Sequence, residues 1–143
     1  MDQEPDGTDS SSVQAQWLKE QLGKSKSRWN IVYDHYPPYS SSTTHGSSAA
    51  MRWPFARWGA SAVLSGHVHV YERVMHDGIP YFTDGVGGAP RYAFGHAIPG
   101  SAVRFAASWG AQRVTVDGDA MRFDFFTREG KLIDSYRVGA NRR

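Results

Sequence analysis

Two short apolar runs that each lead into a histidine constrain the fold of this chain most strongly. Residues 31–33 (Ile-Val-Tyr) come just before His35, and residues 60–65 (Ala-Ser-Ala-Val-Leu-Ser) come just before Gly66. Such short runs, bounded by Pro or Gly, predict buried strands. Between them, residues 49–58 have apolar side chains at helical spacing. The pattern predicts a small βαβ unit, whose two strands are parallel.

Histidines stand where both predicted strands end. Parallel strands bring their carboxyl ends to one edge of a sheet, where α/β proteins place their ligands. In the segment Gly66-His67-Val68-His69, an extended backbone would point both imidazoles to the same side. Neutral imidazole is the commonest metal ligand. The sequence therefore predicts a metal site formed by His35, His67 and His69, with satisfied structural histidines as the alternative.

The remaining segments predict a helix, a hairpin, a loop and a meander. Val13, Trp17 and Leu22 share one helical face, and Ser11 with Gln14 has the spacing of a capping box, which predicts a helix over residues 12–22. The predicted hairpin joins residues 71–76 to 79–83 through Asp77-Gly78, a type I′ turn pair. A loop is predicted over residues 91–110. An antiparallel meander is predicted for residues 112–116, 121–127 and 132–138.

Composition bounds the class of protein. The 143 residues, 40% of them hydrophobic, suffice for one buried core, and the absence of cysteine excludes disulfides and thiolate zinc sites. No apolar run approaches membrane-spanning length and no leader is present, so we expect no membrane association and no signal peptide in this chain; export of a longer parent stays open and the compartment is unknown. The net charge of +2 without a dense basic run predicts no nucleic-acid partner.

Several ordered segments resemble the calcineurin-like metallophosphoesterases, in particular a bacterial branch similar to purple acid phosphatases. They are residues 33–41 (YDHYPPYSS), 44–47 (THGS), 51–55 (MRWPF), 63–73 (VLSGHVHVYER) and 81–90 (YFTDGVGGAP). The resemblance implies an α/β fold: the C-terminal half of a metallophosphoesterase α/β sandwich, with a small βαβ unit followed by an antiparallel meander. It implies domain bounds of 10–138, between a loose N-terminal segment, 1–9, and a tail, 139–143.

The resemblance also implies a reaction and a set of site residues. The reaction is metal-dependent hydrolysis of phosphate esters, as a phosphatase or phosphodiesterase, by a metal-bound hydroxide. The family uses two divalent or mixed-valence ions (Fe, Mn or Zn), of which His35 and His67 would hold one and His69 its neighbour. His45 would bind a phosphate oxygen or protonate the leaving group; the alternative is an exposed loop histidine. Arg73 could clamp phosphate; the alternative is a surface pair with Glu72.

The sequence departs from the family pattern in its carboxylate and amide ligands. The D-x-H and G-N-H segments of the family do not occur, the Gly-Asp pair of the sequence, Gly118-Asp119, lies in the turn of the predicted meander, and neither asparagine, Asn30 or Asn141, is followed by histidine. We therefore expect an incomplete ligand set with one ion, to which Asp34 or Asp84 could add an oxygen. The open alternatives are a catalytically silent metal-binding fragment and half of a split enzyme completed by another chain. An exposed sheet edge would favour a homodimer.

Overall fold

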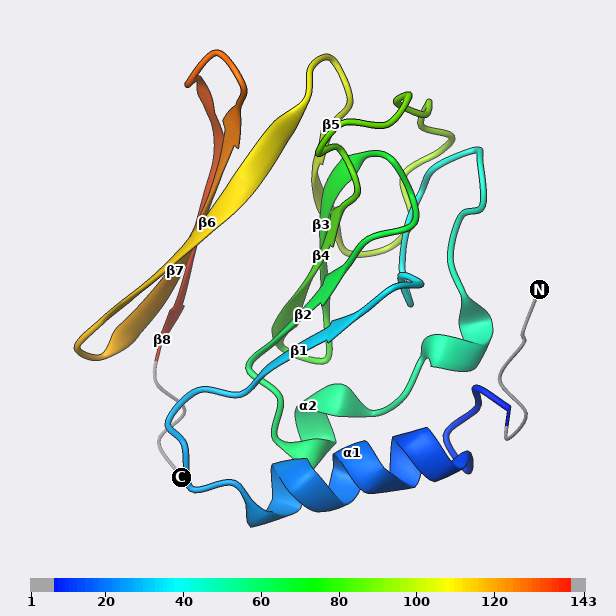
Figure 1. The fold of residues 1–143 in the computed structure, drawn as a ribbon, viewed down its shortest axis with the longest axis vertical. Coiled ribbons are helices and arrows are strands. Elements are labelled where there is room, and N and C mark those ends of the chain that lie inside the picture. Colours follow the sequence, from blue (N-terminus) through cyan, green and yellow to red (C-terminus); the bar gives the residue numbers. More distant parts are fainter. Residues whose placement is uncertain (1–6, 140–143) are drawn as a thin grey trace.

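The computed structural model describes residues 7–139, in which two β-sheets pack face to face and helices cover the outer face of one of them (Figure 1). This confirms the expected α/β sandwich of a βαβ unit followed by a meander. The predicted terminal segments 1–9 and 139–143 lie largely outside the described residues. The elements are α1 (Val13–Lys24), β1 (Ile31–Asp34), a 3₁₀ turn (Ala49–Met51), α2 (Phe55–Trp58), β2 (Ala62–Ser65), β3 (Tyr71–His76), β4 (Ile79–Asp84), β5 (Ser101–Phe105), β6 (Gly110–Asp117), β7 (Ala120–Thr127) and β8 (Leu132–Gly139).

The first sheet has the strand order β1-β2-β4-β3-β5 and places the predicted site. β1 and β2 are parallel, with Asp34 opposite Ser65 at their carboxyl ends. The next residues therefore meet: a Cβ on Gly66 would lie 3.7 Å from Nδ1 of His35. The parallel pairing inferred from the two apolar runs is confirmed.

Turn chemistry fixes the β3–β4 hairpin as predicted. Asp77 and Gly78 have φ values of 49° and 79°, the left-handed backbone that a type I′ turn requires at both positions. The prediction of a loop over residues 91–110 is wrong in part, because Ser101–Phe105 forms β5 and pairs antiparallel with β3. Half-exposed side chains alternate with exposed ones along this edge strand, which gives a weak apolar signal.

Both predicted helices differ from expectation. Ser12, not Ser11, caps α1, and its hydroxyl accepts a hydrogen bond from the amide of Ala15. Trp17 is 60% exposed, because Ala15 and Leu22 face the core instead. The helix predicted over 49–58 is split into a 3₁₀ turn and α2 at Pro54, which lacks the N–H that a continuous helix needs.

Two hydrophobic clusters lie on opposite faces of the first sheet. The cluster on the helical side includes Val32, Phe55 and Tyr81. The cluster between the sheets contains stacked pairs, with ring centroids of Phe82 and Phe123 separated by 4.6 Å. Within residues 7–139, no helix has the length and apolar character needed to cross a membrane.

Candidate metal centre

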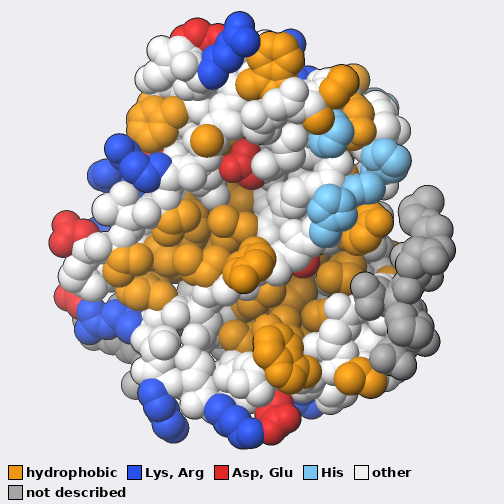
Figure 2. Space-filling model, viewed as in Figure 1, with side chains coloured by type: hydrophobic (Ala, Val, Ile, Leu, Met, Phe, Trp, Pro, Cys, Tyr) orange, Lys and Arg blue, Asp and Glu red, His pale blue; other side chains and the backbone are white. Residues whose placement is uncertain are grey.

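Three imidazoles gather at the carboxyl edge of β1 and β2. The His67 ring centroid lies 4.9 Å from that of His35 and 4.6 Å from that of His45. Nδ1 of His67 is 3.0 Å from Nε2 of His35. Figure 2 shows histidine side chains clustered at one margin of the visible face. The structure therefore brings together His35, His45 and His67, which are distant in sequence.

The backbone of residues 66–70 is coiled and not extended. The amide of Val68 donates to the carbonyl of Gly66 (2.5 Å) and the amide of Val70 to the carbonyl of Val68 (2.8 Å), which makes two successive three-residue turns. Val68 and Val70 are fully buried, and His67 has a φ of 52°. The two valines anchor the segment in the core while the histidines stay outside. The expectation of an extended strand at His67 and His69 is wrong for this reason.

His69 is oriented separately from the pair of His35 and His67. Its Nδ1 lies 2.8 Å from the carbonyl oxygen of Pro90. A carbonyl can only accept, so His69 donates the Nδ1 proton and Nε2 keeps its lone pair. A backbone carbonyl in this position is the usual partner that fixes the tautomer of a metal-binding histidine.

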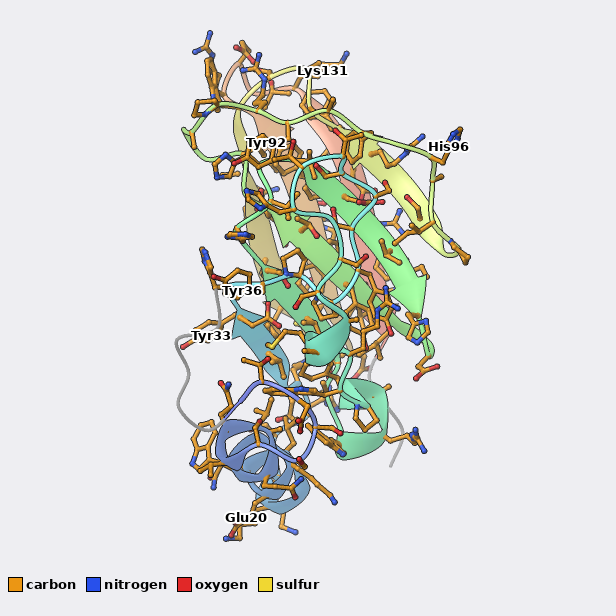
Figure 3. The ribbon with its side chains drawn as sticks, turned by 90° about the vertical axis from the view of Figure 1, so that its right-hand side faces the viewer. Glu20, Tyr33, Tyr36, Tyr92, His96 and Lys131 are labelled. Carbon is orange, nitrogen blue, oxygen red and sulfur yellow. The ribbon has the colours of Figure 1, made fainter. Side chains whose placement is uncertain are left out.

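Two tyrosines that sequence reasoning missed complete the cluster. The Tyr92 ring stacks on His69 with centroids 4.3 Å apart, and the Tyr36 ring lies 4.4 Å from that of His67. Figure 3 shows Tyr36 and Tyr92 at the same edge of the molecule, whereas His96 lies on the opposite side. Tyr36 adjoins His35 in sequence and could have been suspected. Tyr92 had no local signal.

The surroundings of His67, the central imidazole of the cluster, favour its neutral form. Desolvation lowers the pKa of His67, and the neighbouring His45, His35 and His69 lower it further. A neutral imidazole retains the lone pair that a metal requires. Two imidazole nitrogens bound to one tetrahedral ion at about 2.0–2.1 Å lie roughly 3.3 Å apart, close to the 3.0 Å between His35 and His67. The spacing of the pair is that of two ligands of one ion, and without an ion the same two nitrogens are within hydrogen-bond distance of each other.

No third ligand joins this pair within residues 7–139, where no three His, Cys, Asp or Glu side chains are arranged to hold an ion together. Burial raises the pKa of Asp34 to about 7 and that of Asp84 to about 6. Ser65 lies near enough to lower the Asp34 pKa in part, yet neither Asp34 oxygen accepts a hydrogen bond of ordinary geometry from the described residues. Both carboxyls are thus buried beside the edge without joining the histidines in a set of three.

His45 lies on a loop that is hydrogen-bonded to the carboxylate of Glu72. The carboxylate of Glu72 is fully buried and accepts hydrogen bonds from the Ser41 amide (2.7 Å) and hydroxyl (2.6 Å). Its other donors are the hydroxyls of Ser40 (3.3 Å) and Ser101 (2.7 Å). Glu72 therefore ties the loop that leads to His45 onto β3 and β5.

Arg73 has partners different from those expected. Its guanidinium forms a two-pronged ion pair with Asp134 (2.7 and 3.1 Å) and lies over the ring of Tyr136 (4.4 Å). The Tyr71 hydroxyl donates to the same carboxylate (2.8 Å). Arg73 thus links the two sheets, and both earlier interpretations, a phosphate clamp and a surface pair with Glu72, need correction because Asp134 already holds the guanidinium.

A glycine allows the close packing that shapes the coiled segment. A Cβ on Gly85 would lie 2.3 Å from the carbonyl oxygen of Val68 and 3.2 Å from Cα of His69. Because these are backbone atoms, no side-chain rotation can relieve the clash. We expect Gly85→Ala to lower the free energy of unfolding by about 1–3 kcal/mol, the usual cost of overpacking.

Urea denaturation measures this effect, and Gly88→Ala is the matched control because a Cβ there meets nothing within 4 Å. The control should unfold at the same urea concentration as the wild type. Equal midpoints for Gly85→Ala and the wild type would show that the coiled segment does not depend on this contact.

The chain resembles known proteins along most of its length. Residues 1–71, which end just after the coiled segment, match the family model described as calcineurin-like phosphoesterase. Purple acid phosphatase 15 of Arabidopsis thaliana is 40% identical over 73 residues, 46% of this chain and 14% of the relative. Tartrate-resistant acid phosphatase type 5 of Homo sapiens is 28% identical over 137 residues, 88% of this chain and 42% of the relative.

A solved structure shows the same fold. The purple acid phosphatase PPD1 from yellow lupin (Lupinus luteus) seeds superimposes with a TM-score of 0.80 at 19% identity, over 92% of this chain and 29% of that chain. The chain thus spans less than half the length of these relatives. They come from plants and human, and the expected bacterial branch stays a prediction.

Proposed function

We propose that this chain is a calcineurin-like phosphoesterase and that it hydrolyses phosphate esters with a divalent ion held by His35 and His67. The observation that carries the proposal is the 3.0 Å approach of the two imidazole nitrogens at the carboxyl edge of parallel strands. Acid phosphatases among the relatives support the same class of reaction. Fe, Mn and Zn all suit a site of imidazole and oxygen ligands.

The side chains around the pair have separate roles in the proposed reaction. An ion bound there would polarise a phosphoryl oxygen and lower the pKa of water. His45, whose ring lies 4.6 Å from that of His67, would give a proton to the leaving oxygen. His69, with its tautomer fixed by Pro90, presents Nε2 as a ligand for a second ion. Tyr92 holds the His69 ring by stacking.

Hydrolysis of p-nitrophenyl phosphate and bis(p-nitrophenyl) phosphate tests this function. We expect turnover by the purified chain to require Fe, Mn or Zn and to stop with a chelator. His45→Ala should lower kcat by about 10²-fold or more, the usual share of a proton donor. His96→Ala, on the opposite side of the molecule (Figure 3), should match the wild type. Turnover that is insensitive to the chelator, or equal in His45→Ala, contradicts the proposal.

A second candidate function is metal binding without catalysis. It is favoured by one observation: within residues 7–139 the histidine pair has no third ligand. This candidate predicts that the chain binds metal and gives no turnover with either ester, a result that separates it from the first proposal.

A further inference from the structure

The sandwich is open along one strand of the second sheet. β6 is one of the two edge strands in the order β6-β7-β8. Val114 and Val116 pair with Phe123 and Met121 of β7, which are fully buried between the sheets. The two valines belong to the same face, yet Val114 is 37% and Val116 56% exposed. Figure 2 shows apolar side chains gathered in the middle of the face on which β6 lies in Figure 1.

The backbone of β6 also offers unpaired groups along this edge. At its beginning, the amide of Gly110 donates across the edge to Val86 (3.2 Å), and the backbone of Gln112 donates to the Asp84 carboxyl. Backbone groups alternate along a strand, so even-numbered residues of β6 direct their N–H and C=O away from β7. Val114 and Val116 continue this series, with no backbone partner across the edge within residues 7–139.

The side chains of β6 are complementary to those of a second copy. If two β6 strands pair antiparallel about a two-fold axis at Thr115, each residue 113 lies opposite a residue 117. Arg113 then faces Asp117 of the second copy twice, because the contact is symmetric. Val114 faces Val116 in the same way, and these are the residues whose backbone groups point outward. In this single register, opposite charges face each other, valines face each other, and the outward backbone N–H groups face C=O groups of the second copy.

We propose that β6 is the interface of a homodimer in which two β6 strands join the second sheets of both copies into one. The interface covers the exposed valines and satisfies the outward backbone groups. β1, one edge of the first sheet, is less suitable because it has only four residues, Ile31–Asp34, and no opposite charges. Arg113 and Asp117 are both exposed in the single chain. The Arg113 guanidinium also lies 3.2 Å from the Asp124 carboxylate of its own chain, so a contact with Asp117 of the second copy adds to that ion pair.

Sedimentation velocity over a range of concentrations tests the proposal with the full chain. The wild type should form dimers that dissociate on dilution. Val116→Pro should be monomeric, because proline removes an outward N–H without taking a hydrogen bond from the β6–β7 ladder. Arg137→Pro is the matched control, since Arg137 lies on the outer edge strand β8 and its amide also points away from β7. It should remain dimeric.

Charge exchange tests the register. Asp117→Lys places like charges opposite Arg113 and should raise the dimer dissociation constant by about tenfold. The exchanged protein Arg113→Glu/Asp117→Lys should return close to the wild-type value, and circular dichroism confirms that each variant is folded. A wild type that stays monomeric at all concentrations, or a folded exchanged protein no tighter than Asp117→Lys, would overturn the proposal.

Discussion

Replacing Glu72 by alanine is expected to lower the free energy of unfolding by about 4 kcal/mol, because several buried donors lose their common acceptor at once. Its carboxylate is fully buried and accepts from one amide and three hydroxyls. A buried donor left without a partner costs roughly 1–3 kcal/mol. Alanine also leaves a cavity where the Glu72 side chain was, which adds to the cost.

Urea denaturation measures this loss as a lower midpoint with an unchanged slope. Glu72→Gln should fall between alanine and the wild type, since an amide keeps one acceptor oxygen but turns N–H groups toward other donors. Glu20→Ala is the control: Glu20 is exposed and pairs with Lys24 within α1, so its removal should change stability by less than about 0.5 kcal/mol. A Glu72→Ala midpoint as close to the wild type as that control would refute the role of Glu72.

The βαβ unit, and the histidines at the carboxyl ends of its strands, could be predicted from local sequence patterns. Strands that end at Pro or Gly, a two-residue Asp77-Gly78 turn and parallel pairing follow from steric rules that act over a few residues. For this reason the approach of His35 to His67 could be predicted from sequence. The meander of β6, β7 and β8 was likewise predicted from the sequence.

Contacts that depend on tertiary structure could not be predicted. Nothing near Glu72 in the sequence shows that its donors come from the loop after β1 and from β5. Arg73 likewise takes its partner from β8, some 60 residues later. The coiling of residues 66–70 follows from burial of Val68 and Val70, which the period of two did not distinguish from an extended strand. These features depend on how distant elements pack.

The second large effect concerns the metal. His67→Ala removes one of the two imidazoles that approach each other, so the remaining His35 is a single ligand and should bind an ion far more weakly. His69 faces a different neighbour, Pro90. His69→Ala should therefore leave the ion at the His35–His67 pair largely in place. His67→Ala, in contrast, should abolish binding of this ion. Exposed His96 is the control residue for this comparison.

The metal content of the purified chain, measured by inductively coupled plasma mass spectrometry after loading with Zn²⁺ and removal of the excess, tests the central claim most directly. We predict about one tightly bound ion per wild-type chain, as for a site with the His35–His67 pair at its centre. The ion should be retained in His69→Ala and His96→Ala and lost in His67→Ala and His35→Ala. A wild type without bound zinc, or a His67→Ala protein that keeps it, would contradict the account.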